Sequence, residues 1–79
     1  MATDQTVIYR FDWGEPVKIT DNAPEKYLAV AQGSVCGIRQ IDTEGVAKDF
    51  GEPIGTVLYL VEGSAGEAIE IPERFLVAF

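Results

Sequence analysis

The sequence predicts a small all-β domain, a sandwich or barrel of about five short strands with one short helix or 3-10 turn. β-branched residues dominate the apolar set, with eight Val and seven Ile against four Leu. Such side chains pack better on a pleated sheet than on a helix. Eight Gly and four Pro interrupt the 79 residues at short intervals, which is typical of short strands joined by turns. The length supports a single domain over residues 1–79.

The N-terminal part predicts a first strand that is interrupted and then resumes as extended structure. Apolar residues alternate over 7–11 and resume over 16–20, so each segment places its apolar side chains on one face. The Trp13-Gly14 pair separates the two segments, because glycine commonly marks a turn.

Residues 24–32 predict a short helix. Asn22 suits an N-cap, Pro24 suits the first turn, and Gly33 suits the left-handed position that follows a helix. A loop or an irregular strand is the alternative, because the Tyr-Leu-Ala-Val-Ala stretch is apolar on all sides.

The second half predicts four strands, over residues 34–41, 54–62, 67–71 and 75–79. Residues 42–49 between the first two predict a polar loop, or a loop with a single turn around Val46 and Ala47. The Gly-Ser-Ala-Gly sequence at 63–66 predicts a four-residue hairpin loop, and residues 72–74 predict a 3-10 turn.

Inward-facing positions define the expected core: Val17, Ile19, Val35, Ile38, Val57, Tyr59, Val61, Ile69, Ile71 and Leu76. Cys36 has apolar neighbours, which predicts a buried, reduced thiol that packs as a small hydrophobe.

Three segments carry a resemblance to known proteins: Gly-Ser-Val-Cys-Gly-Ile at 33–38, Leu-Tyr-Leu-Val-Glu at 58–62, and Glu-Ala-Ile-Glu-Ile-Pro-Glu-Arg-Phe-Leu at 67–76. The pattern resembles small SH3-like barrel proteins of mobile DNA, among them predicted immunity proteins of polymorphic toxin systems and integron-cassette proteins. The resemblance implies a small SH3-like β-barrel, and it consists mostly of strand and turn chemistry.

One enzyme family shares this pattern, the small plasmid-borne dihydrofolate reductases. In that family a Val-Gln-Ile-Tyr stretch before a proline lines a shared central pore. This chain has Ala-Ile-Glu-Ile at 68–71, so the amide and the phenol that contact substrate and cofactor in that family have no counterpart. An acidic pore would also repel NADPH and folate.

The charge balance excludes several classes of function. Thirteen acidic residues against six basic ones give a net charge of −7, which argues against nucleic-acid binding. The absence of histidine removes His-based catalysis and His-ligated metals, and a single cysteine removes an intrachain disulfide. We therefore expect no cofactor, no bound metal and no catalytic residues. With neither an apolar run of membrane-spanning length nor a signal peptide, a cytoplasmic location is the default expectation.

A six-residue pattern occurs twice, as Asp-Trp-Gly-Glu-Pro-Val at 12–17 and Asp-Phe-Gly-Glu-Pro-Ile at 49–54. The structural interpretation is one turn used twice, because Gly accepts a positive φ and Pro tolerates the first position of a strand. The functional interpretation is a paired recognition surface, because aromatic anchors flanked by charge are favoured at protein interfaces. The residues of that surface would be Trp13, Phe50, Asp12, Glu15, Asp49 and Glu52. Both interpretations can hold together.

The C-terminal segment predicts a homo-oligomer, most simply a dimer. Alternation in 75–79 makes both faces of the last strand apolar, with Phe75, Val77 and Phe79 on one of them. An exposed apolar strand needs a cover, and a two-fold interface covers the same patch on both copies. The alternative is that an N-terminal strand, through Ile8 and Phe11, covers this edge within one chain.

The leading function is accordingly a non-catalytic protein-binding module, an immunity-type inhibitor whose acidic-aromatic surface blocks a basic partner protein. The alternative is an oligomeric small-molecule-binding or enzymatic barrel with its site at a symmetry axis. We expect no membrane partner under either interpretation.

Overall fold

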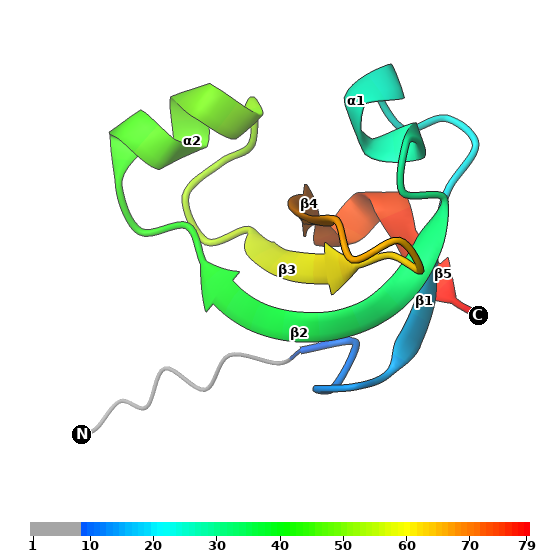
Figure 1. The fold of residues 1–79 in the computed structure, drawn as a ribbon. Coiled ribbons are helices and arrows are strands. Elements are labelled where there is room, and N and C mark those ends of the chain that lie inside the picture. Colours follow the sequence, from blue (N-terminus) through cyan, green and yellow to red (C-terminus); the bar gives the residue numbers. More distant parts are fainter. Residues whose placement is uncertain (1–8) are drawn as a thin grey trace.

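A computed structural model describes residues 9–79, and their strands form a five-stranded antiparallel sheet in the order β4-β3-β2-β1-β5 (Figure 1). The strands are β1 (Pro16–Ile19), β2 (Gln32–Gln40), β3 (Val57–Glu62), β4 (Ala68–Pro72) and β5 (Leu76–Ala78). Two helices, α1 (Glu25–Leu28) and α2 (Glu44–Phe50), and one 3-10 turn, η1 (Glu73–Phe75), complete this described part of the chain. Within the described residues β4 and β5 do not pair with each other, so the sheet is open.

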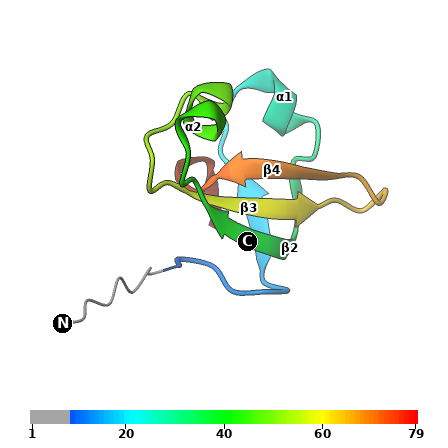
Figure 2. The same ribbon diagram turned by 90° about the vertical axis from the view of Figure 1, so that its left-hand side faces the viewer.

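The long strand β2 lies at the centre of the sheet and curves strongly (Figures 1 and 2). Its first residues pair with β1, and Ser34 to Gln40 pair with β3. A β-bulge between Val35 and Gly37 shifts the register with β3. At Gly33 an added Cβ would collide with the carbonyl oxygen of Glu62, so this close approach of β2 and β3 requires glycine.

The core lies on the side of the sheet that α1 covers. It contains Phe11, Val17, Ile19, Ala23, Tyr27, Val30, Val35, Val57, Tyr59, Val61, Ile71, Phe75 and Leu76. The expected core is thus confirmed, with Ile38 and Ile69 only partly buried against it. The Tyr27 ring from α1 packs on the Phe75 ring from η1, at 5.8 Å between centroids. α1 is short, and its one buried side chain, Tyr27, packs against the sheet.

The buried hydroxyl of Tyr59 attaches the segment before β1 to the sheet. It accepts hydrogen bonds from the backbone N–H groups of Arg10 (3.0 Å) and Phe11 (3.3 Å). It donates to the Glu73 carboxylate at 2.7 Å. Burial, followed by the hydrogen bond to Glu73, raises the pKa of Tyr59 to about 12.

The N-terminal predictions need correction. Val7 and Ile8 lie outside the described residues, and Tyr9, Arg10 and Phe11 are not in a strand. Phe11 nevertheless reaches the core, where its ring meets that of Tyr59 edge-on at 5.3 Å between centroids.

The helix predicted over 24–32 and the loop predicted over 42–49 also need correction. α1 ends at Leu28, four residues before the predicted end, and Ala31 rather than Gly33 takes the left-handed conformation, with φ of 63°. Gly33 belongs to β2 instead. The polar loop predicted over 42–49 is largely a seven-residue helix. Thr43 caps this helix by accepting a hydrogen bond from the Val46 N–H, so α2 has a local start signal of its own.

Two further residues differ from expectation. Cys36 is exposed rather than buried, because it is the extra residue of the bulge and has no partner on β3. Ile54 was expected to start β3. It lies instead in a turn before the strand and is 54% exposed, because the following Gly55 has a positive φ of 101°.

Candidate functional site

Both copies of the six-residue pattern form turns that need their glycine. Gly14 has φ of 78° and Gly51 has φ of 65°, which only glycine adopts without strain. The first turn leads into β1, whose first residue is Pro16. The second ends α2, with Gly51 in the left-handed position after the helix. The positive φ predicted for both glycines is confirmed, but the two copies form different local structures, a turn before a strand and the end of a helix, and Pro53 does not begin a strand.

The first copy is a hydrogen-bonded turn that displays its aromatic side chain. The Gly14 N–H donates to the carbonyl of Val35 at 2.7 Å, and the Val35 N–H donates to the carbonyl of Glu15 at 3.0 Å. The Asp12 N–H donates to the Glu15 carboxylate, and the Trp13 N–H donates to the Asp12 carboxylate, both at 2.9 Å. The Trp13 side chain is nonetheless 64% exposed. The turn backbone is thus fixed by four hydrogen bonds while the indole faces solvent.

The second copy, at 49–54, differs from the first because its aromatic side chain and its glutamate are partly or fully buried. Phe50 is only half-buried, and Glu52 is 8% exposed. Glu52 accepts a hydrogen bond from Arg74 at 2.8 Å and forms an ion pair with it. Burial, and then the nearby Glu52 charge, raises the pKa of Tyr27. Glu52 is therefore part of the internal packing and not of an exposed acidic rim.

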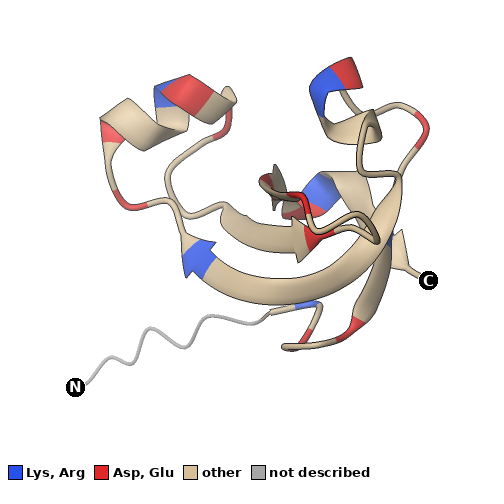
Figure 3. Cartoon of the chain, viewed as in Figure 1, with Lys and Arg blue, Asp and Glu red and all other residues tan. Residues whose placement is uncertain are grey.

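The two copies lie on opposite sides of the molecule. The turn at 12–15 lies below β2 in Figures 1 and 2, whereas α2, which ends in the second copy, lies above the sheet. Acidic residues occur in both regions in Figure 3. The fold thus separates the residues predicted for a paired surface into two groups, with Asp12, Trp13 and Glu15 in one and Asp49, Phe50 and Glu52 in the other.

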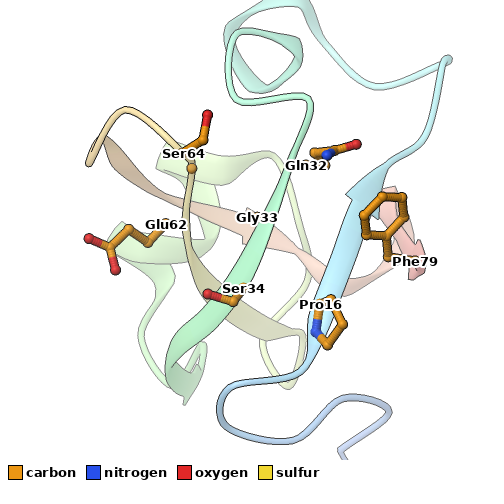
Figure 4. Close-up of a pocket in the computed structure, with 8 residues that line it drawn as sticks. Pro16, Gln32, Gly33, Ser34, Glu62, Ser64 and Phe79 are labelled. Atoms are coloured by element: carbon orange, nitrogen blue, oxygen red, sulfur yellow. The ribbon is translucent and has the colours of Figure 1, made fainter.

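A hollow of about 330 Å³ lies close to the first turn. Its lining comes from β1, β2, the end of β3 and the C-terminus: Pro16, Gln32, Gly33, Ser34, Glu62, Gly63, Ser64 and Phe79. Figure 4 shows Phe79 and Pro16 on one side of β2, and Glu62 and Ser64 on the other. Strand pairing places Pro16 opposite Ser34 and Ser34 opposite Glu62, so these three side chains form one row on one face of the sheet.

Sequence reasoning did not assign these residues to a site. They converge only through the pairing of β1, β2 and β3, and no local spacing in the chain indicates that register. The sequence predicts Phe79 for a dimer interface instead.

The remaining acidic side chains are dispersed. Glu70 on β4 forms an ion pair with Arg39 on β2 at 2.6 Å, and Glu73 accepts the Tyr59 hydroxyl. Across residues 9–79 no three acidic or cysteine side chains converge in a group that would hold a metal ion.

The C-terminal residues divide between the core and the surface. Phe75 is 7% exposed and packs in the core of its own chain. Val77 and Phe79 are exposed, on a strand whose one neighbour in the described sheet is β1. The predicted dimer interface is reduced to these last two side chains.

Comparisons with protein-family models, with curated proteins and with solved structures found no match. None of the helices formed by residues 9–79 has the length and apolar character needed to cross a bilayer.

Proposed function

We propose that this chain is a non-catalytic binding module of SH3-like architecture that recognises a basic partner protein, as an immunity-type inhibitor would. The contact surface is the turn at 12–15, with Trp13 as the aromatic anchor and Asp12 and Glu15 as its acidic neighbours. The order of the elements supports the architecture: the sheet order is β4-β3-β2-β1-β5, and a 3-10 turn separates the last two strands.

One observation carries the choice of surface: an exposed tryptophan stands on an ordered backbone. A large side chain on a preorganised turn loses little entropy when it is buried by a partner, which is the character of interface anchors. Within the described part of the chain, Asp12 and Glu15 form no ion pair with Lys or Arg. Their charges therefore remain available to a cation of the partner.

A selection of random peptides against the immobilised chain tests this proposal. We expect the enriched peptides to be rich in Lys and Arg, and their affinity to fall at least tenfold in Trp13→Ala with little change in melting temperature. Ile54→Ala is the matched control, because Ile54 is also an exposed apolar side chain in a turn but lies outside this surface. Recovery of no basic peptide, or equal losses in both variants, would refute the proposal.

A further inference from the structure

We propose that the free edge of β4 adds one strand of a basic partner protein, an extended segment in which Arg or Lys alternates with an apolar residue. The added strand lies antiparallel to β4, beside Ala68, Ile69 and Glu70. This contact is separate from the turn that carries Trp13. It goes beyond the proposed function, because it gives the partner a second surface and a defined backbone conformation.

The main chain of β4 leaves hydrogen-bonding groups unpaired along its outer edge. In the described part of the chain β3 is the one neighbour of β4. The Gly63 N–H donates to the carbonyl of Glu67 at 2.8 Å, and antiparallel pairing alternates from there. Ile69 therefore directs its N–H and C=O toward β3, whereas Ala68 and Glu70 direct theirs away from it. No other main-chain group of the described residues pairs with these two.

Such unpaired groups are a template for a strand of another chain. Pro72 limits the template at one end, because proline has no N–H to donate, and the hairpin loop at 63–66 limits it at the other. The template is therefore short. An isolated peptide should bind it weakly, and only the segment opposite residues 68–70 should be ordered.

Glu62 gives this edge a preference for a cation. It is exposed at the end of β3, pairs in register with Ala68, and forms no ion pair with Lys18 or any other basic residue of the described chain. Figure 4 shows its side chain directed away from β2, and β4 lies on that side of β3. Ala68, between the Glu62 carboxylate and the free edge, is small and exposed. A cationic side chain on the added strand can therefore pass over it.

The sheet already contains a basic side chain that spans the required distance. Arg39 on β2 reaches Glu70 on β4 across β3, with 2.6 Å between Nε and Oε2. Glu62 is separated from an added strand in the same way, with only β4 between them. It lies on the same face of the sheet as Glu70, because Leu60 pairs with Glu70 and side chains two residues apart point the same way. We therefore expect Arg or Lys opposite Ala68 to reach Glu62.

The other face of the edge favours an apolar side chain. Ile69 is half-buried against the core, on the face opposite to that of Ala68 and Glu70. A residue opposite Ile69 on the added strand would cover its remaining exposed surface. The edge thus favours an apolar residue next to a basic one. The net charge of −7 opposes a second copy as the occupant and attracts a basic segment.

Hydrogen exchange measured by nuclear magnetic resonance on the full chain tests the edge. In the free chain the amides of Ala68 and Glu70 should exchange much faster than those of Ile69 and Ile71, which face β3. Near-saturating acetyl-Thr-Arg-Val-Arg-Thr-amide should slow exchange at Ala68 and Glu70 about tenfold, because the added strand would pair with both groups.

Matched peptides separate strand addition from simple charge attraction. N-methylation of both arginines removes the N–H groups that would face β4 and should abolish binding, because alternate residues of a strand direct these groups to the same side. N-methylation of the valine removes an N–H that faces away from β4 and should leave the affinity nearly unchanged. The permuted peptide acetyl-Thr-Arg-Arg-Val-Thr-amide keeps the charge, loses the alternation and should bind several-fold more weakly.

Protein variants test the two contributions of the edge. Glu62→Gln should weaken binding about fivefold, the range for an exposed ion pair. The control Glu44→Gln removes the same charge from α2 and should leave the affinity unchanged. Ala68→Pro removes one N–H from the free edge, where a strand tolerates proline, and should abolish the protection of Glu70. If Ala68→Pro does not fold, the N-methylated peptides test the same hydrogen bonds on the native chain.

Three results would overturn the proposal: equal binding of the two N-methylated peptides, an unchanged affinity in Glu62→Gln, or slow exchange of the Ala68 and Glu70 amides in the dilute free chain. Protection that rises with protein concentration alone would assign the edge to a second copy and would also overturn it.

Failure of this edge and failure of the proposed function are distinguishable. Trp13 lies in none of β2, β3 and β4, so Trp13→Ala should keep the peptide-induced protection of Ala68 and Glu70. Shifts at residues 12–15 report the other surface separately. If selected basic peptides depend on Trp13 while the β4 amides stay unprotected, only the added strand is wrong.

Discussion

Substitution of Tyr59 by Phe removes one oxygen that joins three parts of the chain. The hydroxyl donates to Glu73 at 2.7 Å and accepts from the N–H groups of Arg10 and Phe11. The ring keeps its shape, so no cavity forms. One hydrogen bond to a charged group is lost, and the buried Phe11 N–H loses its partner, so we expect a loss of about 2–4 kcal/mol in the free energy of unfolding.

Urea denaturation at neutral pH measures this loss. In a domain of this size, a loss of that order lowers the melting temperature by roughly 10–25 °C. Tyr9→Phe is the control, because Tyr9 is exposed, and it should change stability by less than about 0.5 kcal/mol. If the two variants were equally stable, the buried hydroxyl would contribute nothing, and the reasoning about the N-terminal segment would be wrong.

The same hydroxyl predicts a dependence on alkaline pH. The folded-state pKa of about 12 is higher than the ordinary value of 10.0, so the folded chain holds this proton more tightly than the unfolded chain. The stabilisation is complete below pH 10 and is lost as the pH rises toward 12, at about 1.4 kcal/mol per pH unit. The stability difference between the native chain and Tyr59→Phe should therefore shrink above pH 10, and a constant difference would contradict the assignment.

Three further predictions concern the rest of the fold. Arg74→Met should reduce the free energy of unfolding, measured by urea denaturation, by about 2 kcal/mol, because it leaves the buried Glu52 carboxylate without its cation. The double variant that also carries Glu52→Gln should recover part of that loss. Gly33→Ala should destabilise the chain by about 3 kcal/mol or prevent folding, because the added Cβ would collide with β3. Gly45→Ala on α2, where a Cβ meets open space, should instead stabilise the chain by about 0.5–1 kcal/mol. Equal melting temperatures of the two variants would refute this pair of predictions. If the exposed strand β5 forms a dimer, sedimentation equilibrium should give a dimer mass for the native chain and a monomer mass for Val77→Lys, and a monomer in both cases would refute the dimer.

Local signals predicted the second half of the sheet well. The Gly-Ser-Ala-Gly loop at 63–66 does join β3 to β4, and a 3-10 turn does follow Pro72. These features depend on neighbours in sequence: glycine permits the reversal, and proline cannot donate to a continued strand pairing. Sequence patterns therefore predict an element of the fold correctly where residues close together in the chain determine that element.

α2 carries a local signal for a helix. Thr43 and Gly51 provide its cap and its left-handed end, as Asn22 and Gly33 do in the helix predicted over 24–32. The composition of the segment is polar, which favoured a loop. Because α2 has no fully buried residue, the apolar periodicity that usually identifies a helix was weak.

Long-range pairing explains the other differences. Cys36 is exposed because the bulge depends on how β2 meets β3, and the two copies of the repeat separate because one precedes β1 and the other ends α2. The hollow depends on three strands and the C-terminus. The sequence therefore predicted Trp13 and Glu15 as candidate binding residues, but it could not predict that Phe50 lies far from them.

The most direct test uses the intrinsic fluorescence of Trp13, the single tryptophan of the chain. Its indole is largely exposed, so its emission should begin near that of tryptophan in water and move to shorter wavelength as a selected basic peptide covers it. The shift should saturate with the same affinity that an independent method such as calorimetry measures, and that affinity should fall as salt is added. Saturating peptide binding with unchanged Trp13 emission would contradict the account, because the partner would then bind another surface.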